Sequence, residues 1–149
     1  MLSKKSVAWL GVGFFLLLDR LLKLLSNTVL STPHTPTSWF GWLPFHNHGA
    51  AFGLPVPSYF VILISAPIIL FIGWLLVHKE TAAGDRLAYA LIFAGAASNL
   101  YDRIVYGFTN DYLLLITGVF NLADVLIISG LLLYVWDHKH HEPHNDKQY

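Results

Sequence analysis

The sequence contains no cysteine and few charged residues. The absence of cysteine excludes a disulfide framework, a thiolate nucleophile, a cysteine-ligated zinc ion and an iron–sulfur cluster. Charged residues make up 12% of the 149 positions, about half of the roughly 25% that is usual in a soluble domain. Nine basic residues balance nine acidic ones, so no basic surplus favours binding to nucleic acid. This composition leaves few polar groups with which to cover an ordinary soluble domain.

Hydrophobic residues, in contrast, make up 55% of the chain, and its mean hydropathy is +0.55. A helix that crosses a bilayer needs about 20 mostly apolar residues. Four segments approach this length with apolar side chains on all faces: 7–25, 59–77, 87–106 and 119–136. The sequence therefore predicts an all-α membrane protein, with a single domain over residues 1–149 that forms a bundle of four transmembrane helices.

Basic residues outside these segments occur only in stretches that would share one side of the membrane. They are Lys4, Lys5, Lys79, Arg86, Lys139 and Lys147. Residues 26–58, between the first two segments, contain no Lys or Arg. The positive-inside rule then places both termini in the cytoplasm, including a tail over residues 137–149. It places residues 26–58 and the connection after the third segment on the outer side.

The predicted outer segment, residues 26–58, is rich in proline and aromatic residues. Its five prolines, among them Pro33 and Pro44, disfavour a long helix. Its aromatic residues include Trp39, Trp42 and Phe45. Two interpretations stay open: an aromatic belt at the level of the lipid headgroups, or a small, partly stranded platform on the outer surface beside a functional site.

Charged side chains within the predicted helices are informative, because each costs at least about 2.5–3.5 kcal/mol at the centre of a bilayer. They include Asp19 and Lys23 in the first helix, Asp102 and Arg103 in the third, and Asp124 in the fourth, while Asp111 follows the third. With the predicted topology, all of these positions lie near the outer interface. This shared depth predicts an outward-facing polar pocket.

Helical spacing groups these residues further. Asp19 and Lys23 are separated by four positions and share a helix face, which favours a buried ion pair that fixes helix packing. Asn99, Asp102 and Arg103 share a face of the third helix, and Asn121 and Asp124 share one on the fourth. The small residues of segment 94–98, which ends at Ser98, would let a neighbouring helix approach closely. We interpret Ser98 as a packing residue.

Three carboxylates, those of Asp102, Asp111 and Asp124, exceed what charge balance in the pocket requires. Two carboxylates a few ångströms apart share one proton, so one can accept a proton from water while the other donates to a carbonyl oxygen. This is the chemistry of an aspartic peptidase. An alternative is a small ion-coupled transporter or a membrane assembly factor that uses the same carboxylates as an ion relay.

Four stretches of the sequence resemble the motifs of a known family, the bacterial lipoprotein signal peptidases (signal peptidase II). They are Asp19-Arg20-Leu21-Leu22-Lys23, Asn47-His48-Gly49-Ala50-Ala51-Phe52, Gly95-Ala96-Ala97-Ser98-Asn99-Leu100-Tyr101-Asp102-Arg103 and Phe120-Asn121-Leu122-Ala123-Asp124. The order of the motifs and the segments that carry them also match.

The resemblance implies an intramembrane aspartyl endopeptidase of the bacterial inner membrane. Its substrate would be a prolipoprotein whose cysteine carries a diacylglyceryl group, cleaved just before that cysteine. By the same resemblance we expect a monomer, surrounded by membrane lipids, that needs no metal or other cofactor.

The resemblance also assigns roles to residues. Asp111 and Asp124 match the two catalytic aspartates, and Asn47 matches an asparagine that helps to hold the substrate. Further residues match positions that line the site: Asn99, Arg103 and Asn121. Asp102 matches a residue that activity requires and is the second choice for the catalytic pair, while Asp19 and Lys23 match a structural pair.

Two features depart from this picture or lie outside it. The connection between Asp111 and Asp124 is short, so we expect that the outer strands found there in many family members are trimmed. The histidine-rich tail, from His138 to His144, contains residues that can bind zinc. We interpret it as a solvated chain end.

Overall fold

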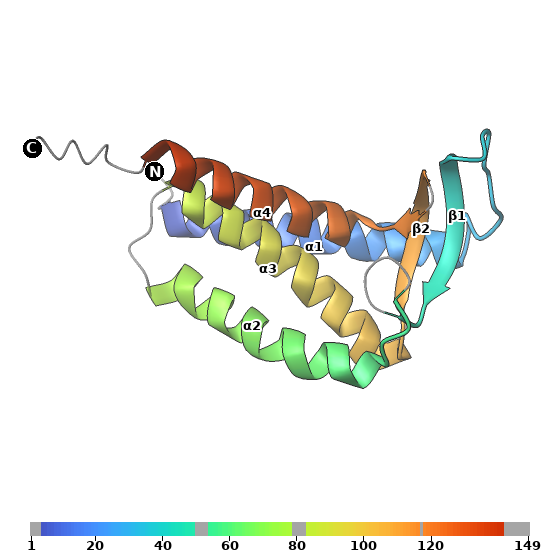
Figure 1. The fold of residues 1–149 in the computed structure, drawn as a ribbon, viewed down its shortest axis with the longest axis horizontal. Helices are drawn as coiled ribbons and strands as arrows, with labels where there is room; N and C mark the ends of the chain where they lie inside the picture. Colours follow the sequence, from blue (N-terminus) through green and yellow to red (C-terminus); the bar gives the residue numbers. More distant parts are fainter. Residues whose placement is uncertain (1–3, 50–53, 79–82, 117, 142–149) are drawn as a thin grey trace, which may run out of the picture.

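The protein, seen in a computed structural model that describes residues 4–49, 54–78, 83–116 and 118–141, consists of long helices and a small sheet. In chain order these are α1 (Lys4–Asn27), β1 (Phe40–Asn47), α2 (Ser58–His78), α3 (Ala83–Tyr106), β2 (Thr109–Leu115), β3 (Gly118–Phe120) and α4 (Leu122–His141). The sheet lies at the end of the bundle where α1 and α3 finish and α2 and α4 begin (Figure 1). This arrangement confirms a mostly helical fold.

Among the described residues, one helix, α2, is long and apolar enough to cross a bilayer by length and composition. The other helices coincide with the remaining predicted segments, but α1 and α3 carry charged residues near the sheet. The count of four membrane-spanning helices stays a prediction. Lys79, Lys147, Ala50–Phe52 and the tail beyond residue 141 lie outside the described residues.

Helix α3 packs closely against α4 because small residues lie at their contact. A Cβ atom added to Gly95 would collide with the backbone carbonyl of Ala123, and one added to Gly130 would lie 2.7 Å from the carbonyl oxygen of Ala88. Ala88, Ala94 and Ala123 are fully buried. The close helix approach predicted from the small residues of segment 94–98 is confirmed.

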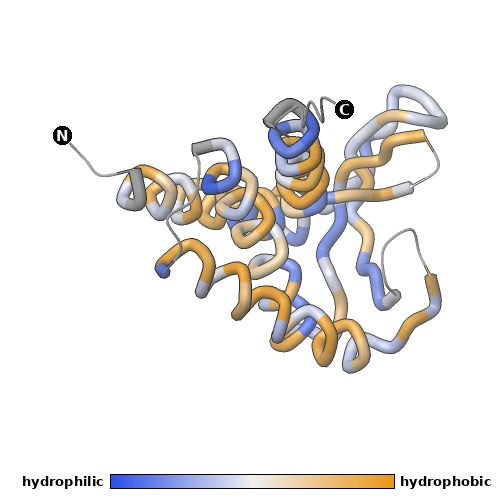
Figure 2. Tube along the Cα trace, turned by 60° about the vertical axis from the view of Figure 1, so that its left-hand side comes forward, coloured by the Kyte–Doolittle hydropathy of each residue, from blue (hydrophilic) through white to orange (hydrophobic). Residues whose placement is uncertain are grey.

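Apolar side chains are distributed differently from those of a soluble bundle. The buried apolar cluster is small and includes Val12, Ile72, Leu76 and Leu126, whereas many large apolar side chains on every helix are exposed. Figure 2 shows hydrophobic residues along most of each helix and hydrophilic ones mainly near the helix ends and loops. Such an outward apolar surface suits lipid as the surrounding solvent.

The three strands form an antiparallel sheet in the order β1-β2-β3. Strand β1 lies in the predicted outer segment, which confirms the partly stranded interpretation. The pairing of β1 with β2 is irregular between Trp42 and Phe45. Pro44 lies within this irregularity, where a residue without an N–H costs no regular ladder hydrogen bond.

Two expectations about the region before α4 are wrong. The platform is not built from residues 26–58 alone, because strands β2 and β3, in the connection before α4, complete the sheet. The fourth helix begins at Leu122 and not at residue 119, because residues 118–120 pair with β2. The short connection is still long enough for a hairpin, since only two residues separate the paired Leu115 and Gly118.

Candidate active site

Helix α4 begins with a reciprocal pair of hydrogen bonds between Asn121 and Asp124. The backbone N–H of Asp124 donates to Asn121 Oδ1 at 2.9 Å, and the backbone N–H of Asn121 donates to Asp124 Oδ2 at 3.1 Å. This capping box satisfies amide groups that a helix start leaves without intrahelical partners. It also fixes the Asp124 carboxyl group at the sheet end of the bundle.

Asp111 reaches the same place from strand β2. The residue is 2% exposed, and the strand register sets it opposite Phe45 of β1. Its Oδ2 accepts a hydrogen bond from Asn47 Nδ2 at 2.9 Å, and its Oδ1 accepts one from Asn121 Nδ2 at 2.6 Å. Asn121 therefore contacts both Asp111 and Asp124, which we name the front pair.

Asn99 joins this network from helix α3. Its Nδ2 donates to Asp124 Oδ1 at 2.8 Å, and its Oδ1 accepts from Asn121 Nδ2 at 3.2 Å. The same oxygen accepts from Lys23 Nζ at 2.7 Å. Three elements that are distant in the sequence thus direct amide groups at the front pair. The structure brings together the asparagines that the sequence analysis placed in the site.

The surroundings of Asp111 favour its protonated form. Burial, and after it the charge of Asp124, raise the pKa of Asp111 from 3.8 to about 6, although the hydrogen bonds from Asn47 and Asn121 act in the opposite direction. A carboxyl group with such a pKa can be either protonated or ionised near neutral pH. That range is the one in which general acid–base catalysis is efficient.

Arg103 lies on α3, one helical turn beyond Asn99. Its Nη2 donates to the carbonyl oxygen of Gly49 at 3.3 Å. This bond connects α3 to the start of the chain between β1 and α2. The remainder of the matching motif, residues 50–52, lies outside the described residues.

A second cluster of charged residues is buried behind the front pair. Lys23 Nζ lies 3.0 Å from Asp19 Oδ2 and 2.9 Å from Asp102 Oδ2. Asp19 and Asp102 are fully buried, and Lys23 is nearly so. We name Asp19 and Asp102 the back pair. The ion pair expected between Asp19 and Lys23 is present, and Asp102 belongs to the same cluster.

Each carboxylate of the back pair also holds the backbone beside one member of the front pair. Asp102 Oδ2 accepts from the backbone N–H of Asn110 at 3.2 Å, and Asn110 immediately precedes Asp111. Asp19 Oδ1 accepts from the backbone N–H of Ala123 at 3.0 Å, and Ala123 immediately precedes Asp124. Lys23 therefore lies between two carboxylates, and each of these holds the backbone N–H of the residue that precedes one aspartate of the front pair.

The sequence analysis missed two members of this cluster. Arg20 Nη1 donates to Asp102 Oδ1 at 2.6 Å, and its guanidinium carbon lies 5.0 Å from the centre of the Tyr101 ring. Ser98, interpreted as a packing residue, is buried and donates from its hydroxyl to Asp19 Oδ2 at 2.5 Å. The signal for Arg20 was its spacing of three positions from Lys23, which sets both side chains on one helix face.

Within residues 4–141, where the structure describes them, no group of three or more His, Asp or Glu side chains is placed to hold a metal ion. His144 of the histidine-rich tail lies outside the described residues.

Comparisons with known proteins agree with this geometry. The family model for signal peptidase (SPase) II matches residues 12–139. A lipoprotein signal peptidase of Teredinibacter turnerae is 33% identical over 146 residues, which cover 89% of this chain and 87% of that protein. One of Halothermothrix orenii is 36% identical over 141 residues, which cover 87% and 95% of the two chains.

Two solved structures share the fold, both described as a bacterial membrane enzyme obtained by the in meso method. The first has a TM-score of 0.83 at 20% identity and covers 96% of this chain and 93% of its own. The second has a TM-score of 0.78 at 20% identity and covers 91% and 94%. Together with the family match and the relatives, these findings show that the chain belongs to the signal peptidase II family and is a membrane peptidase.

Proposed function

We propose that this chain is an aspartic endopeptidase in which Asp111 and Asp124 activate a water molecule. Membership of the signal peptidase II family favours the peptidase over the transporter that the carboxylates alone left open. By the same membership, the substrate is a prolipoprotein with a diacylglyceryl group on its cysteine. The signal peptide is removed by cleavage of the bond just before that cysteine.

The observation that carries this proposal is the position of Asn121. One residue donates to Asp111 from its side chain and to Asp124 from its backbone. Because a single short residue spans both contacts, the two carboxyl groups face a common space. Two carboxylates that face a common space repel each other, so a state in which Asp111 and Asp124 together hold one proton is favoured.

In this state the two carboxyl groups can act as base and acid. The ionised carboxylate accepts a proton from water as the water oxygen attacks the carbonyl carbon of the substrate. The protonated carboxyl donates its proton to the carbonyl oxygen, which gives a tetrahedral diol. As the C–N bond breaks, the carboxyl group that took a proton from water gives it to the nitrogen of the cysteine, and the other carboxylate takes a proton from a diol hydroxyl. The signal peptide leaves with a new carboxyl end, and the pair again holds one proton.

Amide groups around the front pair would orient the substrate. Asn47 lies at the end of β1 and holds Asp111, and Asn99 holds Asp124 from α3. Their remaining hydrogen-bonding capacity can serve the backbone of an extended peptide. Arg103, which already contacts a backbone carbonyl, can bind another in the same way.

The back pair acts as a positioning device in this proposal. Asp102 fixes the N–H before Asp111, and Asp19 fixes the N–H before Asp124. Their own charges are compensated by Lys23 and Arg20, so we expect neither carboxylate to take a proton from water in the reaction. Asp102 is therefore assigned a positioning role and not a place in the catalytic pair.

All four helices cross the membrane in this proposal, in the bacterial inner membrane with both termini in the cytoplasm. Asp19, Lys23 and Asp102 near the sheet are buried with partners, and the partly exposed Arg20 is paired with Asp102, so these residues present little charge to lipid. Exposed apolar residues lie on the other helices as well, such as Leu17 on α1, Ile104 on α3 and Leu132 on α4. The sheet and the front pair then lie at the outer interface, where water is available.

The test replaces one carboxyl group at a time without changing its size. Asp111→Asn and Asp124→Asn are each expected to lower kcat by at least about 10³-fold, as loss of a catalytic acid or base does. The measurement is release of the signal peptide from a diacylglyceryl-modified precursor by the purified protein in detergent. Asp137→Asn, at the opposite end of α4, is the matched control. A chelator is expected to leave the rate unchanged.

Full cleavage by either Asn variant would remove that residue from the pair. Loss of cleavage in Asp102→Asn alone would assign the catalytic role to Asp102 on α3. A folded state similar to that of the unsubstituted protein, measured by thermal unfolding, separates loss of chemistry from loss of structure.

A further inference from the structure

A polar cavity of about 190 Å³ lies on the side of the bundle formed by α1, α3 and β2. Its lining includes Arg20, Lys23, Asn110, Tyr101 and Tyr106. Lys23 and its carboxylate partners are buried between this cavity and the front pair. The cavity is therefore separate from the candidate active site, and the proposed reaction does not use it.

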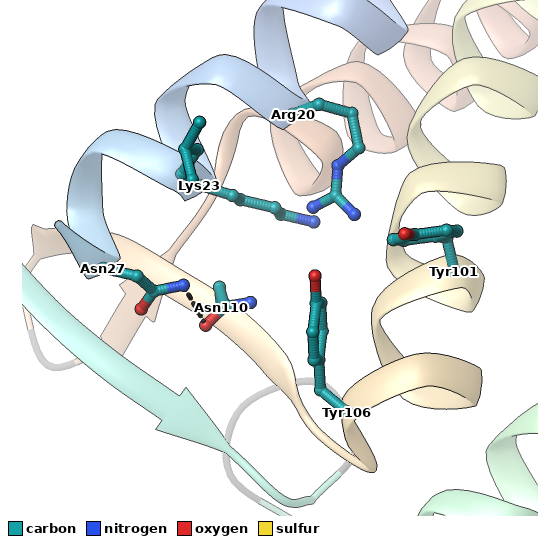
Figure 3. A pocket seen from close by; sticks show the side chains of 7 residues that line it. Arg20, Lys23, Asn27, Tyr101, Tyr106 and Asn110 are labelled. Atoms are coloured by element: carbon teal, nitrogen blue, oxygen red, sulfur yellow. Dashed lines mark hydrogen bonds between the residues drawn. The ribbon is translucent and has the colours of Figure 1, made fainter.

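Hydrogen-bond donors converge on this cavity. Figure 3 shows the Arg20 guanidinium, the Lys23 amine and the Tyr106 hydroxyl pointing into one space, with the Tyr101 ring at its side. Within the described residues, the guanidinium makes one hydrogen bond, from Nη1 to Asp102. The Nη2 group of Arg20, the hydroxyl of Tyr106 and the amide of Asn110 can donate to a ligand rich in acceptor oxygens.

The charge of this region limits what the ligand can be. Arg20 and Lys23 are balanced by Asp19 and Asp102, so no surplus positive charge is available for a multiply charged anion. A phosphodiester, with one negative charge and additional ester oxygens, fits a neutral region that offers several donors. Planar guanidinium groups are well suited to bind phosphate oxygens.

An apolar stripe on α1 leads directly to the cavity. Leu10, Phe14, Leu17, Leu21 and Leu24 are all exposed, they recur at alternating spacings of four and three on one helix face, and Leu24 also lines the cavity. The stripe is about 21 Å long at 1.5 Å per residue. One leaflet of a bilayer contains about 15 Å of hydrocarbon. The stripe is longer than this, so it can contact an acyl chain over the whole length of that chain.

We propose that this cavity binds the phosphodiester headgroup of a membrane phospholipid whose acyl chain lies along the α1 stripe. The polar cavity and the apolar stripe meet at Leu24, which matches the junction between headgroup and chain. The assignment of this lipid to the outer leaflet rests on the proposed topology, whereas the binding site itself does not. The site is distinct from the front pair, at which the substrate is cleaved in the proposed function.

The experiment uses the full chain in nanodiscs that contain a phosphatidylglycerol with a photoreactive group near its headgroup. Crosslinks are expected in peptides that cover residues 17–27 and 101–110, and not in the exposed part of α2. Unlabelled phosphatidylglycerol should compete, whereas diacylglycerol, which lacks the phosphate, and inorganic phosphate should not.

Two conservative variants test the donors. Tyr106→Phe removes only the hydroxyl and is expected to lower labelling about two- to tenfold, the effect of one hydrogen bond. Tyr59→Phe, on α2, removes the hydroxyl of another exposed tyrosine and is the matched control. Arg20→Lys keeps the charge opposite Asp102 but loses the planar fork, and it should lower labelling as well.

Equal labelling of all exposed helix faces, or equal effects of Tyr106→Phe and Tyr59→Phe, would overturn the proposal. Competition by diacylglycerol would show a surface for chains alone, and competition by inorganic phosphate would show a site for a free anion. Each of these results contradicts a phospholipid headgroup site. Labelling requires no catalysis, so a failure of the proposed peptidase mechanism would leave this readout unchanged.

Discussion

The two pairs of aspartates at the sheet end of the bundle, of which Asp19, Asp102 and Asp111 are buried, are held by different groups. The back pair lies within salt-bridge distance of cations, Lys23 between its members and Arg20 beside one of them. The front pair accepts its hydrogen bonds from amide groups, of which Asn121 contacts both members. Asn99 connects the two clusters, because its oxygen accepts from Lys23 while its nitrogen donates to Asp124.

This difference shows how one residue type serves two purposes in one small region. A cation in contact favours the ionised form of a carboxyl group, whereas burial with neutral donors and a second carboxyl nearby favours a shared proton. The back pair is held in one geometry by its ion pairs. The front pair keeps the ability to exchange a proton, which hydrolysis by two carboxyl groups requires.

Removal of the shared cation should have the largest effect on stability. Lys23→Met keeps the length of the side chain but leaves the back pair close together and compensated by Arg20 alone. Breaking a buried ion pair costs about 3–5 kcal/mol. The free energy of unfolding in detergent, followed by tryptophan fluorescence, should fall by this amount. Lys139→Met, at the exposed end of α4, is the control, and equal stability of the two variants would contradict the role of Lys23.

Replacement of one aspartate from each pair should change stability in opposite directions. The folded-state pKa of Asp111, about 6, lies above its ordinary value of 3.8. Its contribution to stability is therefore fully present below about pH 4 and is lost as the pH rises through 6. Asp111→Asn removes this loss and should stabilise the protein at pH 8 by up to about 3 kcal/mol. Asp102→Asn should destabilise it, because Lys23 and Arg20 lose a charged partner.

Unfolding of both variants at pH 8 and at pH 4 measures this difference. The gain from Asp111→Asn should shrink to less than about 1 kcal/mol at pH 4, where the unsubstituted carboxyl group is protonated in the folded chain and close to half protonated in the unfolded chain. A loss of stability in Asp111→Asn at pH 8 similar to that of Asp102→Asn would show that the two pairs are not distinct.

The positions of the charged residues were largely predictable from the sequence. Because charge inside an apolar helix is costly, the shared depth of Asp19, Asp102 and Asp124 already indicated one polar region. Helical spacing predicted the pair of Asp19 and Lys23, since such spacing is local and fixed by the helix itself. The capping box at Asn121 could also be seen in the spacing of Asn121 and Asp124.

What could not be predicted depends on contacts between distant segments. The assignment of Asp102 to the back pair follows from its contacts with α1. The sequence of α3 alone does not show which neighbouring residues Asp102 contacts. Strands β2 and β3 were missed because a strand pair is stabilised by its partner across the sheet and not by its own sequence. The hydrogen bonds from Asn110 and Ala123 to the back pair are donated by backbone N–H groups. Almost every residue type has such a group, so the sequence does not indicate these bonds.

The pH dependence of the reaction should report on the front pair alone. If hydrolysis requires one proton shared by Asp111 and Asp124, kcat/KM should fall about tenfold per pH unit above the upper apparent pKa of the pair. The pKa of about 6 for Asp111 places this decrease at and above pH 6. The measurement is the initial rate of signal peptide release from pH 5 to 8, with thermal unfolding recorded over the same range. A rate that rises between pH 6 and 8 would contradict a shared proton.

The smallest expected effect concerns the hairpin that joins the two members of the front pair. Ile116, between β2 and β3, has a φ of 59° and is largely exposed. A β-branched residue is strained in this left-handed conformation, which asparagine adopts more readily. Ile116→Asn should therefore stabilise the protein by about 1 kcal/mol, because the hydrogen bond from its backbone N–H to Trp39 is retained. Neither pair is touched, so the pH profile should not move. A shifted profile would show that the hairpin, and not the back pair alone, sets the geometry of the front pair.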